Sequence, residues 1–217
     1  MFNLVPSWAI HYEEFWLTVR SRNLWFIKLR YTAVVMLLFF IIFPKYFLEI
    51  NFADEQQFAL LIITFSILVY NITFHYLRQF VKLDADKFNP LHLSILQMIF
   101  DLTALMLIVY FTGSVESPLL LFFVIHMIVG SLILPGFVIY TFAIVIVLAF
   151  WGITVGEYYS LIPHHHVSGF LSFSLHQQFN YVLAINVSFA FLVDMIVLIA
   201  NRMANQLYIR EQQLLES

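Results

Sequence analysis

The stretch FDLTALMLIVYFTGSVESPLLLFFVIHMIVGSLILP, residues 100–135, decides the fold of this chain. Two apolar runs flank a short polar connection at residues 112–118. Each run carries one ionisable side chain, Asp101 in the first and His126 in the second. A charge in hydrocarbon costs several kcal/mol unless it is paired, so such residues are candidates for a functional site.

A helical hairpin would hold these two residues at similar depth. A helix rises 1.5 Å per residue, which places Asp101 about 16 Å and His126 about 12 Å from the connection. We therefore expect both side chains to face the bundle interior, within reach of each other or of one bound molecule. The alternative is a static interhelical hydrogen bond that only holds the bundle together.

The composition indicates a polytopic membrane protein. Of the 217 residues, 62% are hydrophobic and 11% are charged, whereas a soluble domain has about 25% charged residues. The chain has no cysteine, so disulfides and thiol switches within it are excluded. No basic stripe supports nucleic-acid binding.

Six apolar segments reach or approach the length that crosses a bilayer, about 20 residues. We expect an all-α membrane protein with six transmembrane helices, at residues 24–44, 56–80, 91–111, 118–134, 136–158 and 179–202. The fourth and fifth share one uncharged run that is too long for one crossing. Pro135 and Gly136 are the expected break, because proline lacks a backbone donor and glycine permits a tight turn.

Three parts follow from this pattern: residues 1–23, 24–202 and 203–217. Residues 1–23 are predicted to be an amphipathic interfacial segment, although a helix packed on a further soluble domain is an alternative. The apolar positions that support it are Leu4, Trp8, Tyr12, Phe15 and Val19.

Residues 203–217 continue the sixth span without a proline or glycine. Met203, Leu207, Arg210 and Leu214 follow heptad spacing, which predicts a cytoplasmic helix that starts a dimeric coiled coil. We expect the natural protein to continue into a cytoplasmic module.

The basic residues predict the orientation. All ten lysines and arginines except Lys45 fall on the side of the N-terminus or in its flanks. The positive-inside rule then places both termini in the cytoplasm. Lys28 and Arg30, in the first turns of the first span, are expected to reach water at the interface.

Other polar residues within the spans are predicted to be structural. Arg30 and Asp194 are both near the inner ends of their spans, so an ion pair between them is expected. Four further residues are expected to form interhelical hydrogen bonds: Asn71, His75, Gln97 and Asn186.

The three adjacent histidines, residues 164–166, lie in the connection after the fifth span. Adjacent side chains point in different directions, so three such imidazoles rarely bind one ion, and the spacing predicts no metal site. No nucleophile triad or phosphate-binding loop is visible, and no catalytic residue is predicted.

The segment around Asp101, then Tyr110-Phe111-Thr112-Gly113-Ser114-Val115-Glu116-Ser117-Pro118, then the apolar span with His126, resembles the membrane region of sensor histidine kinases of the RegB/PrrB type. That family has six spans, a dimerising helix and a kinase core. Its Gly-Gly-x-x-Asn-Pro-Phe stretch between the third and fourth spans is associated with quinone binding. This chain keeps Gly113 and Pro118 and differs at Ser114, Ser117 and Leu119.

The resemblance implies a transmembrane input module of a two-component sensor in the bacterial inner membrane. It would sense a small amphiphile such as a quinone and signal through the last helix of a homodimer to a kinase module. The ligand-binding residues it implies are Asp101, Thr112, Gly113, Ser117, Pro118 and His126. The alternative is a small proton-coupled transporter, which would favour an inverted repeat between the two halves. A membrane enzyme would need a metal or nucleophile constellation.

Overall fold

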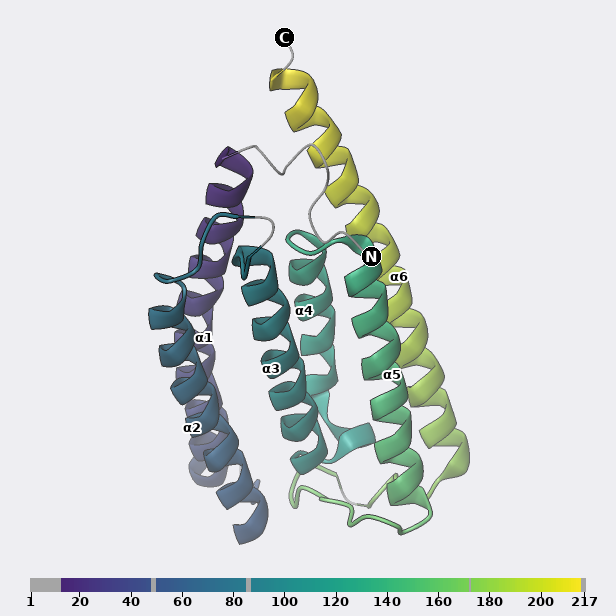
Figure 1. Ribbon diagram of the computed structural model, residues 1–217. Helices are drawn as coiled ribbons and strands as arrows, with labels where there is room; N and C mark the ends of the chain where they lie inside the picture. Colours follow the sequence, from purple (N-terminus) through teal and green to yellow (C-terminus); the bar gives the residue numbers. More distant parts are fainter. Residues whose placement is uncertain (1–12, 48–49, 85–86, 172, 216–217) are drawn as a thin grey trace. The chain divides into compact units, whose positions relative to one another are not determined.

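The computed structural model describes residues 13–47, 50–84, 87–171 and 173–215, and the regular elements in these ranges are all helices (Figure 1). The α-helices are α1 (Glu13–Phe47), α2 (Asp54–Leu77), α3 (Pro90–Phe111), α4 (Phe122–Ser131), α5 (Gly136–Tyr158) and α6 (Phe179–Leu215). Two 3-10 turns, η2 (Ser114–Glu116) and η3 (Pro118–Leu121), precede α4.

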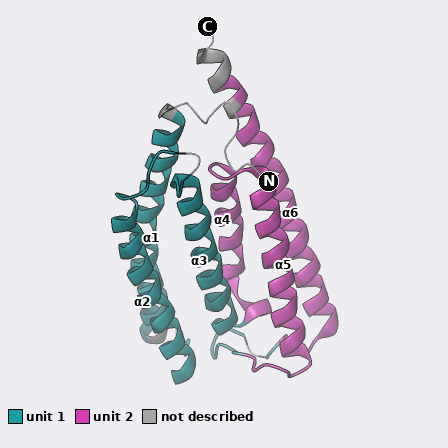
Figure 2. Cartoon of the chain, in the orientation of Figure 1, with its two compact units in different colours: residues 1–113, 165–174 teal, residues 114–164, 175–217 magenta. Residues whose placement is uncertain are grey.

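Five of these helices, α1, α2, α3, α5 and α6, are long and apolar enough to cross a membrane, and Pro118–Ser131 is a shorter apolar helix. The predicted class, an all-α protein suited to a bilayer, is therefore confirmed for the described residues. Figure 2 shows that the chain forms two compact units. Residues 1–113 and 165–174 make the first unit, and residues 114–164 and 175–217 make the second.

In the first unit, α1 packs against α2 and α3, and α2 packs against α3. The buried face of α1 follows helical spacing through Asn23, Ile27, Arg30, Val34 and Ile41. This spacing keeps one stripe of α1 facing its partners along most of the helix.

The N-terminal part of the structure differs from the prediction. From Glu13 the chain forms one helix with the first span and does not break near residue 23, because no proline or glycine stands there. Trp16 and Val19 are buried. Leu4, Trp8 and Tyr12 lie outside the described residues. The helix also continues three residues past Pro44, the predicted end of the first span.

In the second unit, α4 and α5 form a helical hairpin on either side of the predicted break at Pro135 and Gly136. Pro135 is the N-cap of α5 and ends the turn after α4, as expected. At the other end, the Ser114 hydroxyl donates to Glu157 Oε1 over 2.9 Å. The chain from Ser114 to Pro135 thus runs the whole length of α5, about 34 Å for its 23 residues.

The segment that accompanies α5 is not one regular helix, contrary to the prediction for residues 118–134. Ser117 caps η3 by accepting from the Leu119 amide, and Pro118 begins that turn, as expected for a residue without a donor. The first four residues stay in 3-10 geometry and α4 has only 10 residues. A 3-10 turn rises about 2.0 Å per residue, so fewer residues cover the same length.

Helix α6 runs unbroken for 37 residues, which confirms the predicted continuation of the last span. Near the start of α5, Gly136 lies so close to α6 that a Cβ there would be 2.6 Å from Asn201 Nδ2. Residues 202–215 consequently extend beyond α5 within this unit (Figure 1). Met203 and Leu207 are exposed on that extension, and the side chain of Leu214 lies outside the described ones.

Two kinds of contact join the helices of the second unit. Phe189 of α6 packs against Phe123 and Phe150, with ring centroids 5.5 and 4.8 Å apart. Asn186 Nδ2 donates to Thr154 Oγ1 over 2.9 Å, which confirms the predicted interhelical role of Asn186.

Phe123→Ala should destabilise this unit by about 3 kcal/mol, because Phe123 is fully buried and its loss leaves a cavity beside Phe189. The matched control is Phe191→Ala, since Phe191 is 67% exposed on α6. Thermal unfolding in dodecyl maltoside, followed by near-UV circular dichroism, measures both variants. Equal shifts in Tm for the two would contradict this packing.

Candidate functional site

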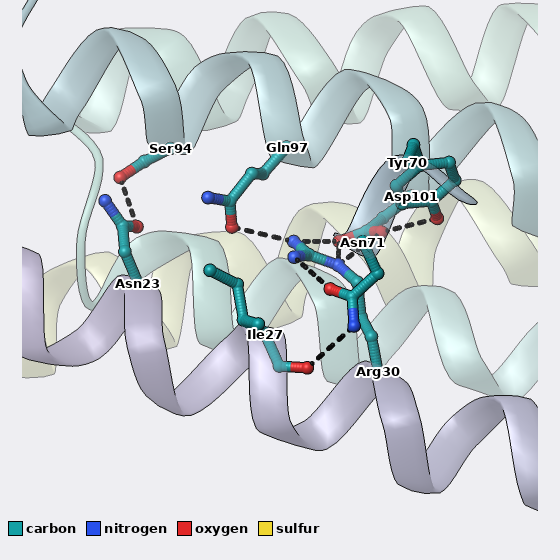
Figure 3. A network of polar contacts seen from close by, with 8 residues as sticks. All are labelled: Asn23, Ile27, Arg30, Tyr70, Asn71, Ser94, Gln97 and Asp101. Atoms are coloured by element: carbon teal, nitrogen blue, oxygen red, sulfur yellow. Dashed lines mark hydrogen bonds and ion pairs between the residues drawn. The ribbon is translucent and has the colours of Figure 1, made fainter. Parts of the chain in front are cut away.

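An ion pair between Arg30 of α1 and Asp101 of α3 lies inside the first unit (Figure 3). Arg30 Nη2 lies 2.7 Å from Asp101 Oδ2, and Arg30 Nε donates to Oδ1 and Oδ2 over 2.8 and 2.9 Å. The side chains are only 9% and 13% exposed. The planar guanidinium thus donates to both carboxylate oxygens. This bidentate geometry is the one in which arginine binds carboxylates most strongly.

Three further side chains complete the network. Tyr70 Oη donates to Asp101 Oδ1 over 2.8 Å. Arg30 Nη2 also donates to Gln97 Oε1 at 2.9 Å, and Nη1 donates to Asn71 Oδ1 at 3.4 Å. Asn71 Nδ2 donates in turn to the Ile27 carbonyl at 3.0 Å. These bonds matter because two charges taken out of water are stable only when their other hydrogen-bonding groups are also satisfied.

Helical spacing explains how three helices bring these groups together. On α3, Ser94, Gln97 and Asp101 are three and four residues apart, so they share one face. On α1, Asn23 and Arg30 share the buried face. The two faces are joined at a second point, where Ser94 Oγ donates to Asn23 Oδ1 over 2.7 Å (Figure 3).

One donor of the network is left over. Gln97 Nε2 is buried and has no hydrogen-bond partner among the described residues. Its amide oxygen is committed to Arg30, so the amide cannot be turned round without losing that bond. An unsatisfied buried N–H costs about 1–3 kcal/mol, and it is a donor available to a ligand.

The structure corrects one prediction about Arg30. It does not reach water at the interface, because its side chain is drawn inward by Asp101 and Gln97, whereas Lys28 is exposed. Within the first unit the guanidinium of Arg30 pairs with Asp101, and Asp194 belongs to the second unit, so the pairing with Asp194 stays a prediction. Asp194 is exposed on α6.

Four of the predicted ligand-binding residues lie at the ends of helices: Thr112, Gly113, Ser117 and Pro118. Thr112 Oγ1 donates to the Ile108 carbonyl over 2.7 Å at the end of α3. Gly113 has φ 104°, a left-handed conformation that favours glycine. Ser117 and Pro118 start η3, as described above. These roles leave their part in ligand binding as a prediction.

Asp101 belongs to the first unit and His126 to the second. Within its unit Asp101 is bound by Arg30 and Tyr70, and half-buried His126 has Nδ1 2.8 Å from the Phe122 carbonyl of its own helix. Their mutual pairing therefore stays a prediction. Sequence reasoning gave Tyr70 no role, and the available signal was its position next to Asn71 on the buried side of α2.

No protein-family model, no curated protein and no solved structure matches this chain. Fold and site define it as a helical protein with several helices suited to a bilayer and a buried charge network in its first unit. Any function must therefore be argued from the chemistry of that network.

Asp101→Asn should destabilise the first unit by about 3–5 kcal/mol, because it leaves Arg30 buried without its counter-charge. The double variant Arg30→Met with Asp101→Leu should recover most of that loss, since no unpaired charge remains. Equilibrium unfolding of the parent, Arg30→Met, Asp101→Leu and the double variant gives the coupling energy. Strictly additive effects would show that the two side chains are not coupled.

Proposed function

We propose that this chain is the transmembrane input module of a sensor histidine kinase of the RegB/PrrB type, and that it detects a small amphiphile such as a quinone. The observation that carries the proposal is the unpaired Nε2 of Gln97 inside the apolar first unit. A quinone carbonyl is an acceptor without donors of its own. It would accept a hydrogen bond from Gln97 Nε2 and leave the Arg30–Asp101 pair intact.

Aromatic rings next to the network support a flat, lipid-soluble ligand. Phe100 is 44% exposed on α3, and its ring packs against those of Tyr70 and Phe74 at 5.3 and 5.6 Å. Phe74 also lies under the Arg30 guanidinium, 5.9 Å from its ring centroid. A ring arriving from the lipid would stack on Phe100 first, and aromatic stacking contributes about 0.5–1.5 kcal/mol per pair.

The last helix supports a signalling role. Its 37 residues correspond to about 55 Å, against about 30 Å for the hydrocarbon core. A single rigid helix that extends beyond α5 from Asn201 onward would carry a shift or rotation to a downstream kinase module. In this proposal the exposed Met203 and Leu207 form the seam of a parallel homodimer.

The proposal includes six membrane crossings with both termini in the cytoplasm of a bacterium. Its support for the fourth crossing is that residues 114–135 run the full length of α5. The proton-coupled transporter remains the alternative. The occupation of both Asp101 oxygens by Arg30 and Tyr70 favours the sensor, because a carrier must release and reload a proton in each cycle.

Decylubiquinone should bind the parent protein in quinone-free nanodiscs and quench the fluorescence of its tryptophans, of which the chain has four. Gln97→Glu keeps the oxygen that binds Arg30 but removes the amide donor, so it should weaken binding about five- to tenfold. Ser94→Ala, which removes a buried hydroxyl one turn earlier, should leave the affinity unchanged. Equal affinity for the parent and Gln97→Glu would exclude this amide as the quinone donor.

Single cysteines placed at Lys82 and Leu161 should be labelled from opposite sides of the membrane if there are six crossings. Both residues are exposed in connections, and the chain has no other cysteine. An impermeant maleimide applied to right-side-out and inverted vesicles measures the sidedness. Labelling of both from the same side would mean that residues 114–135 do not cross.

A further inference from the structure

A second group of ionisable side chains lies in the second unit, at the C-terminal end of α5. It consists of Glu116 of η2, Glu157 of α5 and His164 in the connection to α6. Their side chains are 3%, 0% and 6% exposed. Carboxylates are rarely buried this deeply unless a partner or a metal ion compensates the charge.

Each of the three groups is held in place by further contacts. Glu157 Oε1 accepts from Ser114 Oγ, and Glu116 Oε1 accepts from the Leu175 amide over 2.6 Å. The His164 ring stacks on that of His176, with centroids 3.9 Å apart and planes 18° apart. The arrangement is therefore built before any ligand arrives, which lowers the entropic cost of binding.

The two nitrogens of His164 face two different carboxylates. Nδ1 lies 3.3 Å from Glu157 Oε1, and Nε2 lies 3.5 Å from Glu116 Oε2. The second distance is beyond the usual range of an N–H···O hydrogen bond. It matches the edge of a tetrahedron around one metal ion, about 3.4 Å for bonds of about 2.0–2.1 Å to nitrogen and oxygen.

The charge of the group favours a cation. Two carboxylates face one imidazole, and Glu157 Oε2 is buried with no hydrogen-bond partner among the described residues. Two buried carboxylates beside one imidazole leave net negative charge in this group, which a divalent cation would offset.

We propose that Glu116 Oε2 and His164 Nε2 bind a divalent transition-metal ion such as Zn²⁺, and that Glu157 positions the His164 ring from the Nδ1 side. A carboxylate on the far nitrogen of a ligating histidine is a common arrangement in metal sites, because it fixes the tautomer and the ring orientation. Imidazole with a carboxylate suits zinc and its neighbours better than magnesium or calcium. Water would take the remaining coordination positions.

This inference uses one member of the 164–166 run, so it does not depend on three adjacent imidazoles sharing an ion. The cluster also shares no residue with the Arg30–Asp101 network, which lies in the first unit. The site lies at the end of the helix hairpin that packs against α6, so occupancy would tie η2, the end of α5 and the following connection together.

The test is Zn²⁺ binding to the protein in metal-free nanodiscs, measured by competition with a chromophoric chelator. The parent should bind one ion per chain. Glu116→Gln and His164→Phe should each weaken binding at least tenfold, and His164→Phe keeps an aromatic ring for the stack on His176. Glu157→Gln should weaken it about ten- to a hundredfold through the orientation of His164. His126→Leu, the matched control, removes an imidazole elsewhere in the same unit and should leave the affinity unchanged.

Absorption spectroscopy with Co²⁺ distinguishes a cluster that binds a metal ion from one that only stabilises the fold. Co²⁺ should give visible d–d absorption of a four-coordinate site in the parent and in His126→Leu, and this absorption should be lost in His164→Phe. Far-UV circular dichroism shows that each variant is folded. The proposal is overturned if the parent binds no Zn²⁺, or if Glu116→Gln and His164→Phe both bind it as the parent does.

Discussion

The ion pair between Arg30 and Asp101 is the constraint on which the first unit depends. A guanidinium on α1 and a carboxylate on α3 are both removed from water, and each would be costly alone. Their geometry is bidentate, so α1 and α3 must meet at one rotation and one height. Helix α2 is held in the same register because Tyr70 and Asn71 supply the neighbouring hydrogen bonds.

The second unit is held together by different contacts, between its helices and at the two ends of the α4–α5 hairpin. Gly136 lies against the side chain of Asn201 of α6, and the Ser114–Glu157 hydrogen bond closes the other end of the hairpin. Between them, the rings of Phe123, Phe150 and Phe189 fill the interior. The two buried clusters described above therefore lie in contrasting surroundings, one among helices long and apolar enough to cross a membrane and one at a helix end beside a connection.

Much of the fold could be predicted from run lengths and breakers. The ends of α3 and α5 agree closely with prediction, because Asn89-Pro90 caps one start and Pro135-Gly136 marks the other. The differences between the predicted and the observed helices have local causes. The first helix continues through residue 23 because nothing there breaks it, and the fourth segment begins as a 3-10 turn after the Ser117 cap, a distinction that apolar composition does not encode.

The sequence by itself determined the membrane class, the long helices, the break at Pro135 and the presence of Asp101 as an ionisable residue in an apolar run. Only the tertiary structure decided the partner of that carboxylate, which is Arg30, 71 residues away. It also decided that Gln97 keeps an unpaired amide and that His164 stands between two glutamates. Spacing along a helix shows which residues share a face, but the rotation of that face toward a neighbouring helix is set by packing, and packing depends on all the side chains of both helices together.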